Sequence, residues 1–123
     1  MSDPKDVVIK GRVVFPPGSR PRVAARLVVR VEDVSIADMP SVTVAQRVLD
    51  QVRLPSAEGD SLPFEIPVPK AVLDPKRRYS VRVHADVSGT GTITTGDFVS
   101  TRSYPVQVEQ SGEPGPTVQM QPV

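Results

Sequence analysis

The sequence contains no cysteine, tryptophan or asparagine, and only one histidine and five aromatic residues among its 123 residues. Without cysteine the chain can form no disulfide, thiolate nucleophile or cysteine-ligated metal site. The single histidine, His84, excludes a multi-histidine metal centre within one chain. No run approaches the ~20 consecutive apolar residues of a membrane-spanning helix. The net charge is +1, from 15 basic and 14 acidic residues, so neither nucleic acid nor an anionic membrane is indicated as a partner.

The first six residues carry neither the apolar stretch nor the small-residue cleavage site of a secretory signal, and no cysteine there could accept a lipid. As it stands, the sequence therefore predicts a cytoplasmic protein. The alternative is the periplasm or the outer membrane, if a signal and its lipid-accepting cysteine have been removed.

The composition favours β-strands over helices. Valine supplies 23 residues and leucine only 5, and there are 14 prolines; β-branched residues suit a pleated sheet, and helix interiors reject proline. A chain of this length corresponds to one domain. We expect a single domain over residues 1–123, with a core at about 7–108, flexible segments at 1–6 and 109–116, and a last short strand at 117–120.

Short valine-rich runs separated by Pro, Gly, Asp and Ser predict the individual strands. We expect strands at 7–15, 26–34, 43–52, 62–69, 79–87, 92–95 and 98–108, and one helical or 3₁₀ turn at 71–75. In 43–52 the four-residue valine spacing fits a helix as well as a strand, and we interpret it as a strand with an irregularity. Seven or eight short antiparallel strands predict an all-β sandwich, immunoglobulin- or transthyretin-like in general architecture. A small barrel is the structural alternative.

Two runs alternate strongly enough to predict which side chains face the core. The inward residues are Leu27, Val29 and Val31 in the first run, and Tyr79, Val81, Val83, Ala85 and Val87 in the second. The outward residues are Arg26, Arg30 and Glu32 in the first run, and Ser80, Arg82, His84 and Asp86 in the second.

Prolines mark the run 62–69 as an edge strand. Pro63, Pro67 and Pro69 have the same parity, so one side of this strand nearly lacks N–H donors. Such a strand cannot lie in the middle of a sheet, and its proline side prevents edge-to-edge association.

Several groups of residues invite a chemical interpretation, and each has a simpler one. His84, Asp86 and Ser88 share a strand face, but same-face neighbours are ~7 Å apart, too far for a catalytic triad, so we interpret them as exposed polar residues. The glycine-rich stretch 89–96 lacks the helix and the lysine of a phosphate loop and is typical of a hairpin turn.

The remaining candidates are charged or aromatic. The carboxylates of Glu32, Asp33 and Asp38 lack the ligand pattern of a calcium loop, and the basic triplet 76–78 is typical of a solvated corner. Too few aromatic residues are present for a sugar-stacking platform. We therefore assign no catalytic, cofactor-binding or metal-binding residue, expect no cofactor, and leave the binding residues unassigned.

Six short motifs follow one another within residues 7–108. They are Gly11-Arg12-Val13, Phe15-Pro16-Pro17-Gly18, Asp33-Val34-Ser35, Pro63-Phe64, Asp74-Pro75 to Tyr79, and Tyr104-Pro105-Val106. In this order they resemble the YbaY-like lipoprotein family, which is grouped with the YscW type III secretion lipoprotein chaperones (pilotins). That family has a Gly-x-Val strand, a Leu-Pro-Pro-Gly-like turn, an Asp-x-Ser strand end, a Pro-Phe strand and an Asp-Pro-x-x-x-Tyr turn.

The resemblance implies a compact β-sandwich without catalytic residues, anchored in the bacterial envelope by a lipidated cysteine that this sequence lacks. Pilotin members of that family bind a secretin subunit, and for this chain the resemblance implies a protein partner whose identity stays open. We therefore expect a non-enzymatic interaction or chaperone-like module that binds a protein partner, with strand addition as a plausible mode at an edge other than 63–69. The alternatives are a small-ligand or polysaccharide-binding module lined by Tyr79, Phe98 or Tyr104, and a small hydrolase that uses His84.

Overall fold

The computed structural model describes residues 6–18, 20–35, 39–56, 60–106 and 115–123. In these residues the elements are β1 (Asp6–Val14), β2 (Val23–Asp33), β3 (Val42–Arg53), β4 (Ser61–Pro69), the 3₁₀ turn η1 (Lys70–Val72), β5 (Tyr79–Asp86), β6 (Phe98–Ser100), β7 (Pro105–Val106) and β8 (Thr117–Pro122). The predicted strands are confirmed except for 92–95, which lies in the loop between β5 and β6. The predicted strand 98–108 is divided into β6 and β7, and its last two residues lie outside the described residues.

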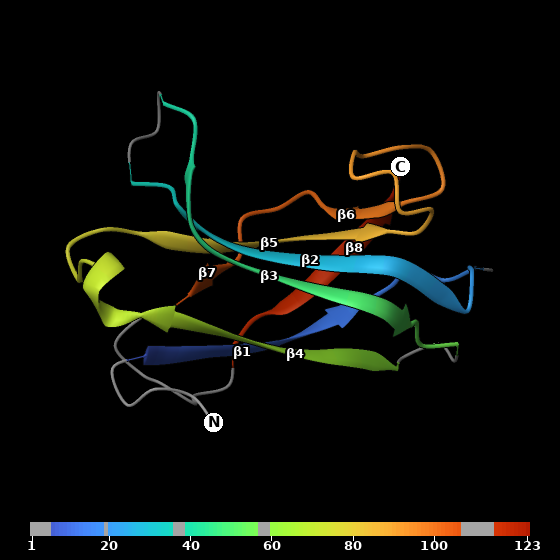
Figure 1. Cartoon of the computed structure of the whole chain (residues 1–123), viewed down its shortest axis with the longest axis horizontal. Helices are drawn as coiled ribbons and strands as arrows, with labels where there is room; N and C mark the ends of the chain where they lie inside the picture. The colour runs from blue at the N-terminus through green and yellow to red at the C-terminus, as the bar shows by residue number, and fades with distance from the viewer. Residues whose placement is uncertain (1–5, 19, 36–38, 57–59, 107–114) are drawn as a thin grey trace.

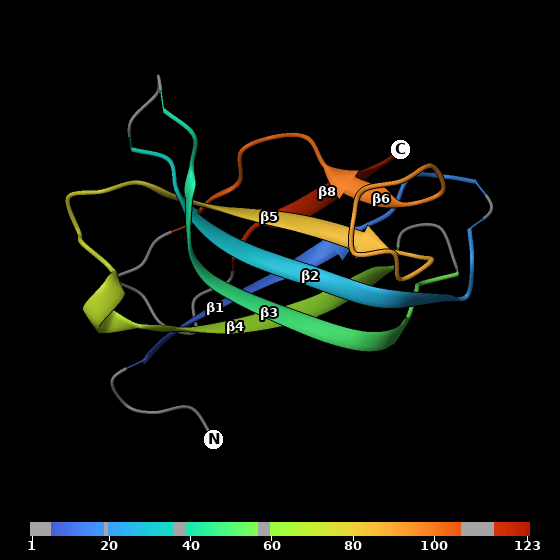
Figure 2. The same cartoon turned by 45° about the horizontal axis from the view of Figure 1, so that its top comes forward.

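The eight strands form one sheet whose order is β3-β2-β5-β6-β8-β1-β4, with β7 paired to β5 beside this path (Figure 1). β8 joins the two halves, because residues 117–119 pair with β1 and residues 120–122 pair with β6. The sheet wraps round until its end strands, β3 and β4, contact each other along the lower edge of the sheet in Figure 2. The all-β class is confirmed, but the sheet is nearly closed like a barrel and not clearly a sandwich. One pair, β1 with β8, is parallel.

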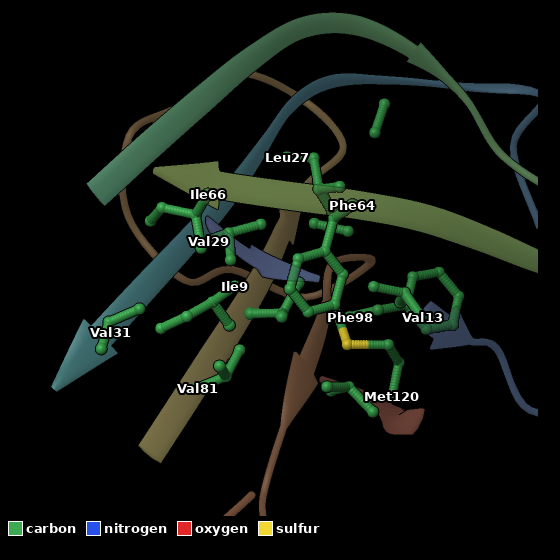
Figure 3. Close-up of a cluster of buried hydrophobic side chains, with 14 of the residues drawn as sticks. Ile9, Val13, Leu27, Val29, Val31, Phe64, Ile66, Val81, Phe98 and Met120 are labelled. Carbon is green, nitrogen blue, oxygen red and sulfur yellow. The ribbon is translucent and has the colours of Figure 1, made fainter. Parts of the chain in front are cut away.

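The core lies inside this curved sheet and is built by the alternating positions of its strands. Figure 3 shows side chains from β1, β2, β4, β5 and β8 pointing toward one another. The predicted inward residues of β2 and the first four of β5 are at most 3% exposed, and Val87 is half-buried. Val118 and Met120 of β8 are also buried, so the core extends past residue 108.

Three residues predicted to face solvent are buried on the outer side of the sheet, namely Glu32, Ser80 and Asp86. Each has hydrogen-bond partners that cover it: the hydroxyl of Ser80 accepts the N–H of Tyr104, and Glu32 accepts a hydrogen bond from Arg82. Alternation distinguishes the two faces of a strand but does not show that a loop covers the outer one.

β3 is a strand with irregularities, as predicted. Its pairing with β2 shifts register beside Val31 and Glu32, and Gln51 has a φ of 51°. These irregularities separate its valines: Val48 is exposed, whereas Val44 and Val52 are half-buried. The helix-like spacing in the sequence therefore does not correspond to one continuous face.

The chain ends differ in part from the prediction of flexible segments. β1 begins at Asp6, inside the segment 1–6. Pro116 is fixed against β1, because its carbonyl accepts the N–H of Arg12 at 3.0 Å. Residues 1–5 and 109–114 lie outside the described residues. The last strand is confirmed and continues to Pro122.

Gly11 is required by close packing between β1 and β4. It lies directly opposite Phe64 in the strand ladder, and a Cβ atom at Gly11 would lie 2.5 Å from the Phe64 ring and 2.7 Å from the Pro116 carbonyl oxygen. The aromatic ring therefore occupies the space above the glycine, a pairing that covers a glycine across strands.

Replacing Gly11 with alanine should destabilise the protein, because either the Phe64 ring or the segment at Pro116 must move. We expect a loss of about 1–3 kcal/mol in the free energy of unfolding, typical of overpacking, measured by urea denaturation. Lys10→Ala, at the exposed neighbouring position, is the control and should change it by less than about 0.5 kcal/mol. Equal effects of the two substitutions would contradict this account.

Candidate functional site

The sheet has two end strands, and β4 is one of them, as its prolines predicted. The N–H of Arg12 points away from β4 and bonds to the carbonyl of Pro116, just before β8. The main-chain N–H and C=O groups of the alternate β1 residues Ile9 and Gly11 therefore point toward β4. Their partners are Ile66 and Phe64. The main chain of the other β4 residues, 61, 63, 65, 67 and 69, therefore points away from β1, and only Ser61 and Glu65 have an N–H there.

The hydrogen bonds of β5 determine which main-chain groups of β2 point toward β3. Val81 and Val83 donate their N–H groups away from β2, to the Tyr104 carbonyl and the Ser100 hydroxyl. Because N–H directions alternate along a strand, the main-chain N–H of the intervening residue Arg82 points toward β2.

The same alternation can be followed from β2 into β3. The main-chain N–H and C=O groups of Arg30, the partner of Arg82, point toward β5. Those of the next residue, Val29, therefore point toward β3, where Val29 pairs with Arg47. Between the irregularities of β3, Gln46 and Val48 consequently turn their N–H and C=O groups away from β2. No described strand pairs with them on that side.

We call the boundary between β3 and β4 the seam. The two strands follow one another in the chain and contact each other, but no main-chain ladder joins them in the described residues. In Figure 1 they are closest near the loop that connects them and separate toward the other end of the sheet. The seam is the only interruption along the path of the described strands.

Arg47 spans the seam with its side chain. It pairs with Val29, which is buried in the core, so its side chain starts on the inner face of the sheet. The guanidinium donates to the main-chain carbonyl of Glu65 at 2.8 Å. This carbonyl points outward, because Glu65 is one of the alternate β4 residues whose main chain faces away from β1. Among the described residues Arg47 makes no ion pair, so its charge is not neutralised by a carboxylate.

An open hollow of about 550 Å³ lies at the end of the seam, beside the loop that joins the two strands. Arg12, Arg53 and Asp60 supply its charged groups, and Leu54 and Leu62 supply apolar surface. Because two arginines face one aspartate, the hollow is net positive, and it lies beside the end of β3 that carries Arg53.

His84 lies in a second polar cluster, on the outer face of β5. Its Nε2 atom is 2.9 Å from a carboxylate oxygen of Asp97. Asp97 also accepts the N–H groups of Val87 and Thr94. Burial raises the pKa of Asp97, but the hydrogen bonds from His84, Thr94 and Val87 outweigh that effect, and the net pKa lies below its ordinary value of 3.8.

The predicted grouping of His84 with Asp86 and Ser88 is not a catalytic triad. The partner of His84 is Asp97, and no described serine or threonine hydroxyl is hydrogen-bonded to His84. Asp86 instead accepts the N–H groups of Gly89, Thr90 and Gly91. The glycine-rich stretch 89–96 is thus a turn folded over a buried carboxylate. Asp86 does not face solvent as expected, and His84 is only partly exposed, because this turn covers both residues.

His84, Asp86 and Asp97 offer ligand atoms within 4.8 Å of one another, close enough for a metal ion. Both carboxylates, however, already accept hydrogen bonds from the main chain on each of their oxygens. A cation would have to displace those N–H groups and the turn that they hold. The residues do not fit a metal site.

The other charged candidates form ion pairs with each other. Glu32 pairs with Arg82 at 2.9 Å, and Asp33 pairs with Arg77 of the basic triplet at 3.0 Å. Hydrogen bonds from Ser35, with a smaller contribution from Arg77, hold the pKa of Asp33 below its usual value. Asp38 lies outside the described residues. The calcium interpretation therefore loses two of its three carboxylates to arginines.

The aromatic residues proposed as a ligand platform are not available. Tyr79 is 3% exposed and Phe98 is 7% exposed, and Phe98 packs edge-on against Phe15 at 5.3 Å. Tyr104 is half-buried, and its hydroxyl accepts the N–H of Gln119.

Sequence reasoning did not identify Arg47, Gln46 and Val48 as site residues, nor Asp97 as the partner of His84. The prolines could have indicated the first group. Because they remove most N–H donors from one side of the run 62–69, the preceding strand in the chain is expected to keep an unpaired edge. Asp97 gave no signal, because only the fold of the 88–97 turn brings it to His84.

Comparison with known proteins identifies the family. The family model described as type III secretion system lipoprotein chaperone (YscW) matches residues 4–120, so the chain belongs to this family, as its motifs indicated. A solved structure of an alternative pilotin from the type II secretion system of Vibrio cholerae has a similar fold. Its TM-score is 0.71 at 22% identity, over 97% of this chain and 98% of that one. No curated protein sequence matches.

The described residues contain no helix that is long and apolar enough to span a membrane.

Amide hydrogen exchange can test which N–H groups of β3 point away from β2 into the seam. We expect the N–H groups of Gln46 and Val48 to exchange ~100-fold or more faster than those of Arg47 and Leu49, since only the latter two bond within the sheet. NMR on the ¹⁵N-labelled protein measures all four. Slow exchange at Gln46 and Val48 would show that the seam is closed by a ladder.

Removing Asp97 should destabilise the protein in a pH-dependent way. Asp97→Ala leaves His84 and two main-chain N–H groups without their acceptor, and we expect a loss of about 2–4 kcal/mol at pH 7. Because folding lowers the pKa of Asp97, its contribution is present above the ordinary value of 3.8 and is lost as the pH falls through the lower folded value.

Urea denaturation of both proteins between pH 7 and pH 3 tests this expectation, since the difference between them should shrink toward the acid end. Asp50→Ala is the control, because the Asp50 side chain is 79% exposed and its ion pair with Arg26 is long, at 3.9 Å. A pH-independent difference would rule out the role assigned to the Asp97 carboxylate.

Proposed function

We propose that this protein is a non-enzymatic chaperone of bacterial secretion and that it binds a secretin subunit as its protein partner. The observation that carries the proposal is membership of the YscW lipoprotein chaperone family over residues 4–120. The likeness to a pilotin fold over nearly the whole chain agrees with it.

The arrangement of polar groups supports binding over catalysis. The buried carboxylates Asp86 and Asp97 are occupied by main-chain N–H groups, and His84 is held by Asp97. Groups along the seam are available for binding, since β3 presents an unpaired main-chain edge there and Arg47 an unneutralised charge. Such features suit recognition of another polypeptide.

The two alternatives have less support. A small-ligand or polysaccharide module would need aromatic surface, and Tyr79 and Phe98 are in the core. A hydrolase that uses His84 would need a nucleophile beside it, and the hydrogen bond of His84 goes to a carboxylate that holds a turn.

The compartment belongs to the same proposal. A chaperone of secretin subunits works in the envelope, the periplasm or the outer membrane included, and the cytoplasm is the alternative location. Fractionation of the source cells distinguishes these compartments.

Direct binding tests the proposed function. The purified protein and a purified secretin subunit from the same organism should form a complex that co-elutes in size-exclusion chromatography and saturates in isothermal titration. An unfolded porin is the control, since it should not bind to a partner-specific chaperone. Absence of a complex with the secretin subunit, or equal binding to the porin, would contradict the proposal.

A further inference from the structure

We propose that the β3 edge along the seam is the docking site, and that it accepts an extended segment of the partner that carries a carboxylate opposite Arg47. This inference rests on the proposed function and names the site and the chemistry of the bound segment.

The main chain of β3 sets the shape of the occupant. Gln46 and Val48 present N–H and C=O groups toward the seam at the spacing of a regular strand, because the ladder with β2 is regular between Ala45 and Asp50. Only an extended main chain matches alternate donors and acceptors of this kind. A helix satisfies its own main-chain groups and has none to offer.

The prolines of β4 explain why this edge stays free. Two strands that follow each other through a short loop normally pair as a hairpin. Here Pro63, Pro67 and Pro69 remove three of the five N–H groups that β4 would contribute to such a ladder, and only Ser61 and Glu65 keep theirs. β4 therefore lies beside β3 without forming a ladder with it, and the main-chain groups on the edge of β3 stay available to another chain.

Side chains along the seam set the sequence preference of the occupant. The inner face of β3 in this stretch carries Ala45, Arg47 and Leu49, which pair with the buried residues Val31, Val29 and Leu27. Ala45 and Leu49 are half-buried and gain cover from apolar residues on an incoming strand. A carboxylate between those apolar residues would take the guanidinium of Arg47 from the Glu65 carbonyl, and a charge-assisted pair is the stronger interaction.

The hollow at the end of the seam adds net positive charge, which favours a partner segment over a second copy of this chain. Arg53 and Arg12 line it together with one acidic residue, Asp60. Two copies paired antiparallel about this stretch of β3 would bring their Arg47 guanidiniums toward each other, a destabilising arrangement.

A designed peptide tests the site without knowledge of the natural segment. The probe is Thr-Lys-Val-Thr-Glu-Thr-Val-Lys-Thr, which places valine, glutamate and valine on one face, and it is titrated into the ¹⁵N-labelled full chain. We expect chemical-shift changes centred on residues 45–50 and slower exchange of the Gln46 and Val48 amides. A peptide with lysine in place of glutamate should bind at least tenfold more weakly.

Two protein variants separate the main-chain contribution from the charge. Val48→Pro removes an N–H that points into the seam and not toward β2, so it should abolish binding while the core amide spectrum is retained; Val48→Thr keeps the N–H and should bind. Arg47→Glu should reverse the preference between the glutamate and lysine peptides. If Val48→Pro fails to fold, N-methylation of the peptide at an amide that faces β3 makes the same test on the unaltered protein.

The results overturn the proposal if no shifts occur at 45–50 up to the solubility limit of the peptide, or if they lie elsewhere. Equal binding by Val48→Pro and Val48→Thr also overturns it, as does a concentration-dependent dimer through β3. The same two variants are then tested against the secretin subunit. Equal binding by both would place the docking site elsewhere and leave the proposed function standing, whereas peptide binding without any secretin complex would leave the site and remove that function.

Discussion

The arrangement of this molecule depends on one shortage, the lack of main-chain N–H groups on the outward side of β4. Pro63, Pro67 and Pro69 all fall on that side, and proline cannot donate to a ladder. A sheet that wraps almost into a barrel therefore stops one ladder short of closure. The exposed edge of β3 and the bridging side chain of Arg47 both follow from that missing ladder.

The polar residues outside the seam serve the fold. Asp86 and Asp97 each collect main-chain N–H groups from the 88–97 turn, and this lets a loop cover the outer face of β5 without leaving buried groups unsatisfied. The described residues contain no buried side-chain nitrogen or oxygen without a hydrogen-bond partner. Because both carboxylates already hold main-chain N–H groups, a metal ion could bind this cluster only by displacing the turn.

Local patterns predicted most of the strands, because each depends on alternation and turn residues within a few positions. The edge position of β4 was also predictable, since proline acts on its own strand. The closure of the sheet was not, because it depends on β8 pairing with β1 on one half of its length and with β6 on the other. The His84–Asp97 contact, the burial of Ser80 and the role of Arg47 likewise depend on segments that only the complete fold brings together.

Most of the motifs shared with the family hold the fold together, and among them only Pro63 of the Pro63-Phe64 motif lies on the seam side of β4. Gly11 makes room for the Phe64 ring, and the N–H of Asp74 bonds to the Tyr79 hydroxyl at 2.8 Å. Arg47 and Val48 lie outside all of these motifs. Family membership therefore constrains the shape of the scaffold more tightly than the sequence of the partner. In a module that recognises main-chain groups, much of the binding site consists of N–H and C=O groups that every residue except proline supplies, so the informative residues are the prolines that withhold them and the few side chains, such as Arg47, that select by charge.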